Sequence, residues 1–179
     1  MDEETRWLTD DAAEAWLQLV AVLQLLPAAL DAQLARASDL SFMEFLALAQ
    51  LADAPQETMR LTDLAAATNA SLPRISRVVA RLERGGAVER RANAEDGRSR
   101  QVSLTILGRQ RLASSAVGHI AFVNRVFVDQ LTAQQLHQLR EIGRHLVEGL
   151  DPKGRVLAET FSGRNGRPGL SRAPDVSGD

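Results

Sequence analysis

The chain has 179 residues, of which 45% are hydrophobic and 25% charged, the proportions of an ordinary soluble globular protein. It contains no cysteine, which excludes disulfides, thiolate metal sites and cysteine nucleophiles. No run approaches the roughly 18 consecutive apolar residues of a membrane span, and the acidic start MDEETRWLTDD is unlike a secretory signal, so we expect one cytoplasmic globular unit with tails.

A long amphipathic helix is predicted over residues 10–37, because apolar residues recur there every three or four positions. Pro27 falls inside this pattern and has no N–H to donate, so we expect the helix to bend or break near residues 23–26. A second helix is predicted over residues 41–52, where a serine cap followed three residues later by Glu44 forms a capping box.

Two short helices are predicted next. The segment LTDLAAAT favours the first, with Thr62 as its cap. The second begins at Ser71, carries Pro73 in its first turn and ends at the pair Gly85 and Gly86. The intervening NASLP is expected to be a turn.

A β-hairpin and two further helices complete the predicted elements. The runs AVERR and RQVSLT alternate like strands and are joined by the polar segment ANAEDG. A helix is then predicted from Thr105 to Gln130, and the capping box TAQQ starts another at Thr132 that ends near Leu150. Residues 151–179, rich in Gly, Pro and Ser, are expected to form a flexible tail.

This order of elements predicts a fold that is mainly α with a small β-hairpin wing, a winged helix-turn-helix. We expect residues 38–112 to form the DNA-binding lobe, with dimerisation helices in 1–37 and 113–150. The apolar faces of the first and last helices need a partner. They could bury each other within one chain, but we favour a two-fold dimer, because two recognition helices can span successive half-sites of DNA.

Positive charge is concentrated in the middle of the chain. Residues 60–111 hold eleven arginines against five acidic residues, a local balance of +6 that leaves −8 for the rest of a chain whose net charge is −2. A basic stripe in an otherwise acidic protein indicates a partner with a phosphate backbone, such as double-stranded DNA.

The second short helix separates its apolar and basic residues. At roughly 100° per residue, one side is expected to be core and comprises Ile75, Val78, Val79 and Leu82. On the other side we predict base contacts near the helix start, mainly from Arg74 and Arg77, and phosphate contacts near its end. An ordinary solvated surface helix is the alternative, which the adjacent hairpin makes less favourable. The predicted DNA contacts outside the wing are Thr62, Ser71, Pro73, Arg74, Arg77, Arg81 and Arg84.

The hairpin loop NAEDGRSR places Arg98 and Arg100 at or just beyond its tip, where an arginine can enter a narrow minor groove. The run EDGRSRQVSLTILGRQRL resembles the wing and exit helix of the MarR family of bacterial transcription regulators, and the resemblance covers roughly residues 10–150. It implies a winged-helix lobe joined to a helical dimerisation lobe, with ligand-tuned binding of palindromic operator DNA. By position it implies that Asp96 anchors the wing and Arg98 enters the minor groove. Gly97 departs from the bulky residue often found there.

The same resemblance implies a small aromatic or anionic effector bound between the two lobes. The candidate pocket residues are Trp16, Phe42 and Phe45, although aromatic residues at helical spacing also fit a plain core. The three histidines form no HxxxH pair and have no flanking carboxylate cluster, so no metal or other cofactor is expected.

The leading interpretation is a ligand-responsive transcriptional regulator, a repressor, that binds palindromic operator DNA as a homodimer. The alternative is a winged-helix architectural or protein-interaction module that binds DNA without sequence preference. The sequence has no Gly-rich phosphate loop and no catalytic constellation, so we do not expect an enzyme.

Overall fold

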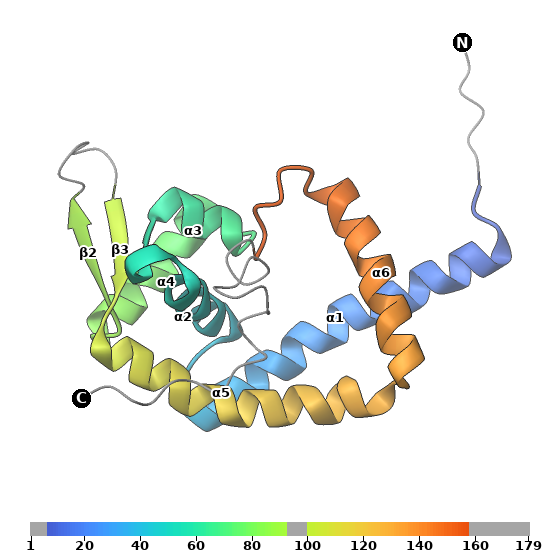
Figure 1. Cartoon of the computed structure of the whole chain (residues 1–179), viewed down its shortest axis with the longest axis horizontal. Coiled ribbons are helices and arrows are strands. Elements are labelled where there is room, and N and C mark those ends of the chain that lie inside the picture. Colours follow the sequence, from blue (N-terminus) through green and yellow to red (C-terminus); the bar gives the residue numbers. More distant parts are fainter. Residues whose placement is uncertain (1–6, 93–99, 158–179) are drawn as a thin grey trace, which may run out of the picture.

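The structure is a computed structural model that describes residues 7–92 and 100–157 of the chain. It consists of a lobe built around a small sheet and of long helices that extend from this lobe (Figure 1). This arrangement agrees with the predicted winged helix-turn-helix carrying additional helices at both ends.

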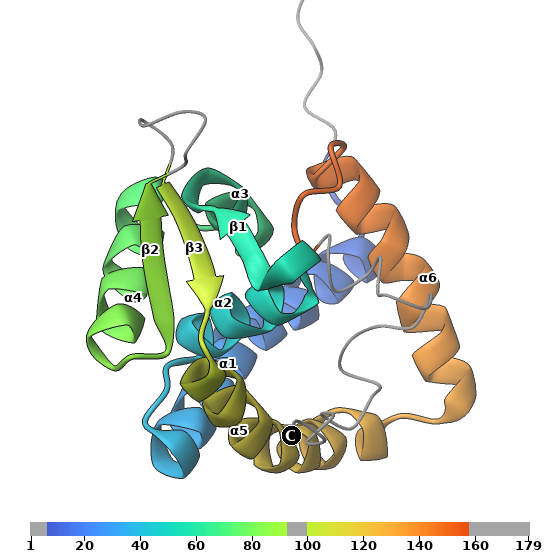
Figure 2. The same ribbon diagram turned by 60° about the vertical axis from the view of Figure 1, so that its left-hand side comes forward.

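Within the described residues, the sheet-containing lobe has three strands, one more than predicted. They are all antiparallel in the order β1–β3–β2, so that β3 lies in the middle (Figure 2). The additional strand β1 pairs Thr58 with Ser103 of β3, and the hydroxyls of these two residues lie 2.9 Å apart. The elements of the lobe are α2 (Phe42–Asp53), the 3₁₀ turn η1 (Pro55–Glu57), β1 (Thr58–Arg60), α3 (Leu61–Ala67), α4 (Leu72–Arg84), β2 (Val88–Ala92) and β3 (Arg100–Leu104).

The core of the lobe lies between α2 and the elements around it. Leu48 and Leu51 of α2 are fully buried against apolar residues of α3, α4 and the sheet. The capping box predicted at the start of α2 is present. The Ser41 hydroxyl accepts a hydrogen bond from the backbone N–H of Glu44, and the Glu44 carboxylate accepts one from the backbone N–H of Ser41. α4 packs its apolar side on this core, and this burial fixes which side of the helix faces outward.

In the part of the chain that the structure describes, three helices lie outside the lobe, and two of them, α1 (Asp10–Ser38) and α5 (Ile106–Val126), pack on each other and on α2. α1 is one continuous helix, so the break that Pro27 was predicted to cause near residues 23–26, as the alternative to a bend, does not occur. Leu30 and Leu34 are buried in the half of α1 that follows the proline. Their burial offsets the loss of the one backbone hydrogen bond that proline cannot make. The 3₁₀ turn η2 (Val128–Gln130) ends the segment predicted as one helix to Gln130, and α6 (Ala133–Leu150) begins with the predicted capping box at Thr132.

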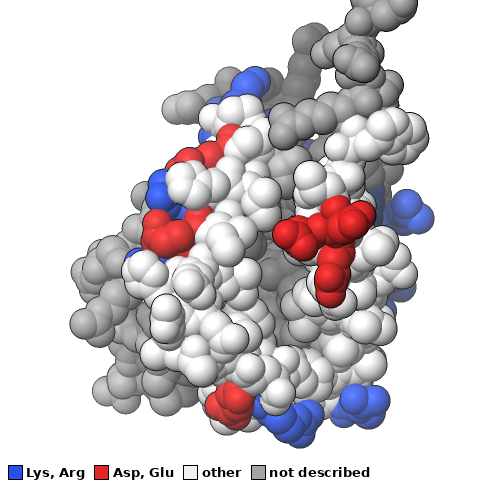
Figure 3. All heavy atoms as spheres, turned by 90° about the vertical axis from the view of Figure 1, so that its right-hand side faces the viewer, with Lys and Arg blue, Asp and Glu red and all other residues white. Residues whose placement is uncertain are grey.

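Much apolar surface remains exposed on α1 and α6. None of the eighteen residues of α6, all of which the structure describes, is buried. The side of the molecule that carries α6 shows broad uncharged surface between separate groups of charged residues (Figure 3). The large apolar residues exposed on these two helices are Trp16, Leu17, Leu19, Val22, Leu23 and Leu25 of α1 and Leu139, Ile142, Leu146, Val147 and Leu150 of α6. The first and last helices therefore do not bury each other within one chain.

By length and composition alone, α1 is also apolar enough to cross a membrane. Core helices of soluble proteins pass the same test, so this property is weak support for a membrane span.

The residues after α6 return to the winged lobe. The Asp151 carboxylate accepts hydrogen bonds from the backbone N–H groups of Val156 and Arg155 at 2.8 and 2.6 Å, which lower its pKa. The N–H of Leu157 then donates to the carbonyl oxygen of Ala67, at the end of α3. The rest of the predicted tail, residues 158–179, lies outside the described residues.

Candidate nucleic-acid interface

Helix α4 presents two chemically different sides. Its buried residues, Ile75, Val79 and Leu82, are at most 1% exposed, and Val78 is half-buried, so the predicted core face is confirmed. On the other side Pro73, Arg74, Arg77, Arg81 and Arg84 are all exposed. Ser71 is the N-cap residue and is also exposed, and its side chain makes no capping hydrogen bond. A polar, cationic helix face is thus held outward by the burial of the opposite face.

Two of these arginines hydrogen bond to the backbone of their own helix. Within the described residues they form no other hydrogen bond or ion pair. The Nε of Arg77 donates to the carbonyl oxygen of Pro73 at 3.3 Å, and the Nε of Arg84 donates to that of Ala80 at 3.4 Å. Both residues are exposed, and these bonds use only the Nε atoms, so the outer nitrogens of each guanidinium can still donate to a base edge or a phosphate.

Arg81 lies in a different environment. Its Nε is 3.1 Å from Oε1 of Glu44, and its Nη2 is 3.6 Å from Oδ1 of Asp39. Arg81 therefore contacts the corner between α1 and α2, although its side chain is still about half exposed.

Thr62 does not have the predicted capping role. Helix α3 begins at Leu61 with Arg60 as N-cap and without a side-chain cap, so Thr62 is the second residue of the helix. It is exposed, and its hydroxyl donates to the carboxylate of the adjacent Asp63 at 3.4 Å. The hydrogen-bonded register of β1 with β3 ends at Arg60, and this pairing sets where α3 begins.

Arg90 of β2 contributes to the site, and sequence reasoning missed it. Its Nη2 donates to the carbonyl oxygen of Ser76 at 2.8 Å, and its Nε lies 3.4 Å from a carboxylate oxygen of Glu83. The side chain is only 18% exposed. Arg90 thus connects the base of the wing to α4. Its partners Ser76 and Glu83 are seven or more residues away in the sequence, so no local pattern predicts these contacts.

The wing is described only at its base. Arg100 opens β3 and is exposed. Arg91 of β2 is also exposed and forms an ion pair with Glu89 at 2.6 Å. The predicted wing residues Asp96 and Arg98 lie outside the described residues.

The candidate effector residues are only partly brought together. Phe42 and Phe45 of α2 both face His119 of α5, with ring centroids 6.1 and 4.4 Å from the histidine ring. Burial lowers the pKa of His119, which favours a neutral ring that interacts with Gln33 at 3.3 Å. Trp16 lies fifteen residues before Asp31, the residue of α1 that contacts Phe42. At 1.5 Å per residue it is about 22 Å away along the helix, so it does not share a pocket with Phe42 in one chain.

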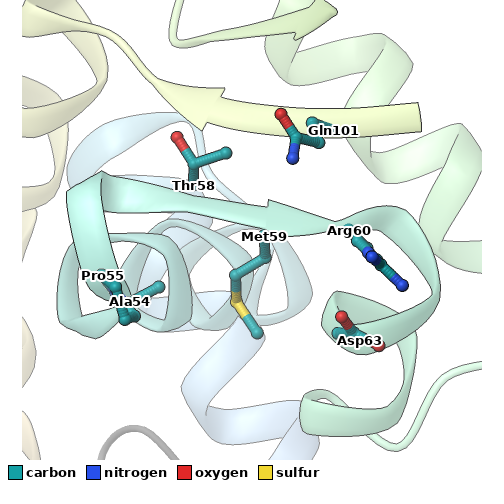
Figure 4. Close-up of a pocket in the computed structure, with 7 residues that line it drawn as sticks. All are labelled: Ala54, Pro55, Thr58, Met59, Arg60, Asp63 and Gln101. Atoms are coloured by element: carbon teal, nitrogen blue, oxygen red, sulfur yellow. The ribbon is translucent and has the colours of Figure 1, made fainter. Parts of the chain in front are cut away.

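An open pocket of about 350 Å³ lies elsewhere, beside β1 (Figure 4). Its lining is largely polar and includes Thr58, Arg60, Asp63 and Gln101, with Met59 as the largest apolar side chain. Effector sites are usually enclosed and mainly apolar, so this depression does not resemble one.

Known proteins resemble this chain over most of its length. The sequence profile of the MarR family matches residues 38–99. The crystal structure of Sco3205, a MarR family transcriptional regulator from Streptomyces coelicolor in complex with DNA, is 35% identical with a TM-score of 0.78, and the match covers 84% of this chain and 94% of Sco3205. AbsC, another MarR family transcriptional regulator from Streptomyces coelicolor, is 31% identical with a TM-score of 0.76, covering 83% of this chain and 99% of AbsC.

A more distant structure confirms the same fold. A mutant MarR from E. coli, complexed with operator DNA, has a TM-score of 0.67 at 20% identity, covering 79% of this chain and 99% of that protein. No curated protein sequence matches the chain.

Proposed function

The chain belongs to the MarR family of transcriptional regulators, and from this premise we propose that it represses transcription by binding palindromic operator DNA as a homodimer. Helix α4 enters the major groove, and the hairpin of β2 and β3 approaches the adjacent minor groove. The DNA complex of Sco3205, at 35% identity, supports DNA as the partner.

The observation that carries this proposal is the cationic face of α4. Arg77 and Arg84 extend from the side opposite the buried residues, and Arg74 and Ser71 lie at the exposed start of the helix. We assign base contacts to Arg74 and Arg77 and phosphate contacts to Arg84 and Arg100. The assignment follows position, because residues near the start of a recognition helix reach base edges.

Substitution of Arg77 and of Arg84 by alanine tests this assignment. Binding to DNA from upstream of the chain's own gene is compared with binding to scrambled DNA at fixed salt, and we expect the unmodified protein to prefer the former. Arg77→Ala is expected to cost roughly 1–3 kcal/mol and to relax the preference at one base pair of each half-site. Arg84→Ala is expected to weaken binding to all sequences alike, because phosphates carry no sequence information.

Two outcomes would contradict these expectations. Equal, sequence-independent losses for both variants would refute the division between base and phosphate contacts. Equal binding of upstream and scrambled DNA by the unmodified protein would instead favour the alternative, a winged-helix module that binds DNA without sequence preference.

The homodimer is supported by the apolar faces of α1 and α6. Each of these helices exposes large side chains in one chain, among them Leu23, Ile142 and Leu150, which are 60%, 55% and 85% exposed. Soluble monomers rarely expose a contiguous apolar surface of this kind. We propose that a second copy covers this surface, and that the protein acts in the cytoplasm, where its DNA partner is found.

We further propose that a small aromatic or anionic compound releases the DNA by acting where α1, α2 and α5 meet. Phe42 is half-buried there beside His119, whose pKa burial lowers, and α2 links this junction to α4 through the shared core. Such a ligand is expected to weaken operator binding roughly 5- to 150-fold. It is also expected to raise the melting temperature of the DNA-free protein, because it binds the folded state.

A screen of phenolic and carboxylate compounds, read by melting temperature and by operator release, measures both effects. Phe42→Leu is expected to reduce both together, whereas His137→Asn, at an exposed position on α6, serves as the matched control. If no compound both stabilised the protein and released the DNA, the effector proposal would be wrong.

A further inference from the structure

Glu44 is a buried carboxylate that contacts two other parts of the fold. It belongs to α2 and is 2% exposed. Its Oε2 accepts hydrogen bonds from the backbone N–H and from the hydroxyl of Ser41, both at 2.8 Å. Its other oxygen, Oε1, lies 3.1 Å from Nε of Arg81. A buried carboxylate needs an opposite charge, and here the charge comes from α4.

Arg81 also contacts the other end of the corner that joins α1 to α2. Its Nη2 lies 3.6 Å from Oδ1 of Asp39, the C-cap residue of α1, whose φ of 51° turns the chain away from that helix. The corner is itself fixed to α1, because the N–H of Phe42 donates to Oδ1 of Asp31 at 2.8 Å. One guanidinium of α4 therefore contacts both the end of α1 and the start of α2.

The position of Arg81 around α4 fits this role better than a phosphate contact. At 3.6 residues per turn, Arg77 and Arg84 lie within about 20° of each other around the helix axis, whereas Arg81 is rotated about 40–60° from them. Arg77 and Arg84 hydrogen bond to their own helix backbone, but Arg81 pairs with Glu44 of α2 and with Asp39 at the end of α1. The arginines that follow one another along α4 are thus not equivalent.

We propose that Arg81 is a positioning residue that fixes the recognition helix to the corner between α1 and α2 through Glu44. This inference rests on the proposed DNA-binding function and replaces the predicted phosphate contact of Arg81. The pair sets how α4 is placed relative to α1, which carries part of the proposed dimer surface. Loss of either partner lets α4 shift in the free protein, so that fitting both recognition helices of a dimer to the two half-sites costs additional free energy although the same phosphates are contacted.

The test compares operator binding at several salt concentrations for Arg81→Ala, Glu44→Gln and the double variant. Glutamine has nearly the volume of glutamate and can still complete a capping box, so Glu44→Gln removes the charge and retains the cap of α2. Each single variant is expected to weaken operator binding about 3- to 30-fold, the range for residues that couple two parts of a fold. The double variant is expected to bind the operator only slightly less tightly than the single variant with the lower affinity, because both substitutions remove the same contact.

The salt dependence distinguishes positioning from phosphate contact. A positioning residue displaces no counterions, so Arg81→Ala is expected to leave the slope of log K against log salt unchanged. Arg84→Ala is the matched control on the same helix, and its slope is expected to fall by about two per dimer, one phosphate for each subunit. If the pair positions α4, Arg81→Ala and Glu44→Gln are also both expected to weaken operator binding.

Three results would overturn the inference. One is a reduced slope for Arg81→Ala together with tighter binding by Glu44→Gln, since removing Glu44 would then release Arg81 to a phosphate. Another is a lower melting temperature in both variants with unchanged affinity of the folded protein, which would make the pair a stabilising contact only. Failure of the unmodified chain to bind any DNA specifically would refute the proposed function first, and this inference with it.

Discussion

Raising the salt concentration from about 50 to 200 mM is expected to weaken operator binding on the order of 10³-fold, if roughly six phosphates are engaged by two subunits. Each phosphate that a cation neutralises releases condensed counterions, and added salt opposes that release. The exposed arginines of α4 and the base of the wing, of which Arg84 and Arg100 are the described examples, supply such cations. Binding isotherms at four or five salt concentrations give the slope.

Matched arginine variants make this prediction specific to the proposed interface. Arg84→Ala is expected to reduce the slope, whereas Arg140→Ala is expected to leave it unchanged. Arg140 is equally an exposed arginine, but it lies on α6 and pairs with Glu141 at 3.2 Å. A nearly flat response of the unmodified protein, or an equal effect of the two variants, would mean that the cationic face of α4 does not meet the phosphate backbone.

Local signals in the sequence were sufficient to predict most helix boundaries. The capping boxes of Ser41 with Glu44 and of Thr132 with Gln135 are formed by residues three apart, and both are present in the structure. The glycine pair after α4 ends that helix as predicted, with Gly86 at a φ of 71° that favours glycine. The separation of α4 into a core side and a basic side also follows from spacing alone.

The wrong boundaries depend on packing between segments that are distant in sequence. Pro27 removes one hydrogen bond of α1, but burial of Leu30 and Leu34 against other helices keeps the helix continuous. Strand β1 has only three residues and exists because it pairs with β3, more than forty residues later. The start of α3 then follows from the end of β1, which is why Thr62 was wrongly predicted as a cap.

The same distinction applies to the candidate interface. Which arginines of α4 are exposed could be predicted from helical periodicity. Two contacts could not be predicted, because each depends on the tertiary arrangement. They are the pair of Arg81 with Glu44 and the contacts of Arg90 with Ser76 and Glu83 of α4. Their shared position near the end of the helix predicts the same phosphate contact for Arg81 and Arg84, whereas the structure separates the two by their partners.

Replacement of apolar residues on α6 by glutamate is expected to dissociate the proposed dimer. Ile142 and Leu146 are 55% and 47% exposed in one chain and lie on the same side of α6. In a dimer whose interface exceeds about 2,000 Å², as is typical of obligate homodimers, both would be buried. Burying an unpaired carboxylate there costs about 3–5 kcal/mol, so the double variant is expected to associate more than 100-fold more weakly.

Light scattering measures this directly, because a dimer has twice the chain mass of 19.5 kDa. His137→Glu is the matched control: it adds a carboxylate to the same helix, but on roughly the opposite side, and is expected to leave the dimer intact. Removal of residues 1–20 is expected to give monomers or aggregates, since it deletes part of the apolar surface of α1. Removal of residues 158–179 is expected to have no effect on mass, because α6 and its return to α3 remain.

The proposed dimer is also expected to determine how strongly the DNA is bound. A monomer presents one α4 and one wing, so it contacts a single half-site and loses the gain that comes from linking two binding events in one molecule. The glutamate double variant is therefore expected to lose operator binding together with its dimer mass, even though every arginine of α4 is retained. Unmodified protein that was monomeric in solution, or that stayed dispersed only in detergent, would contradict the dimer, because the apolar face of α1 would then be covered by something other than a second copy. Retention of full operator affinity by a monomeric variant would show instead that one α4 and one wing are sufficient, and that the two-fold arrangement is not what selects the operator.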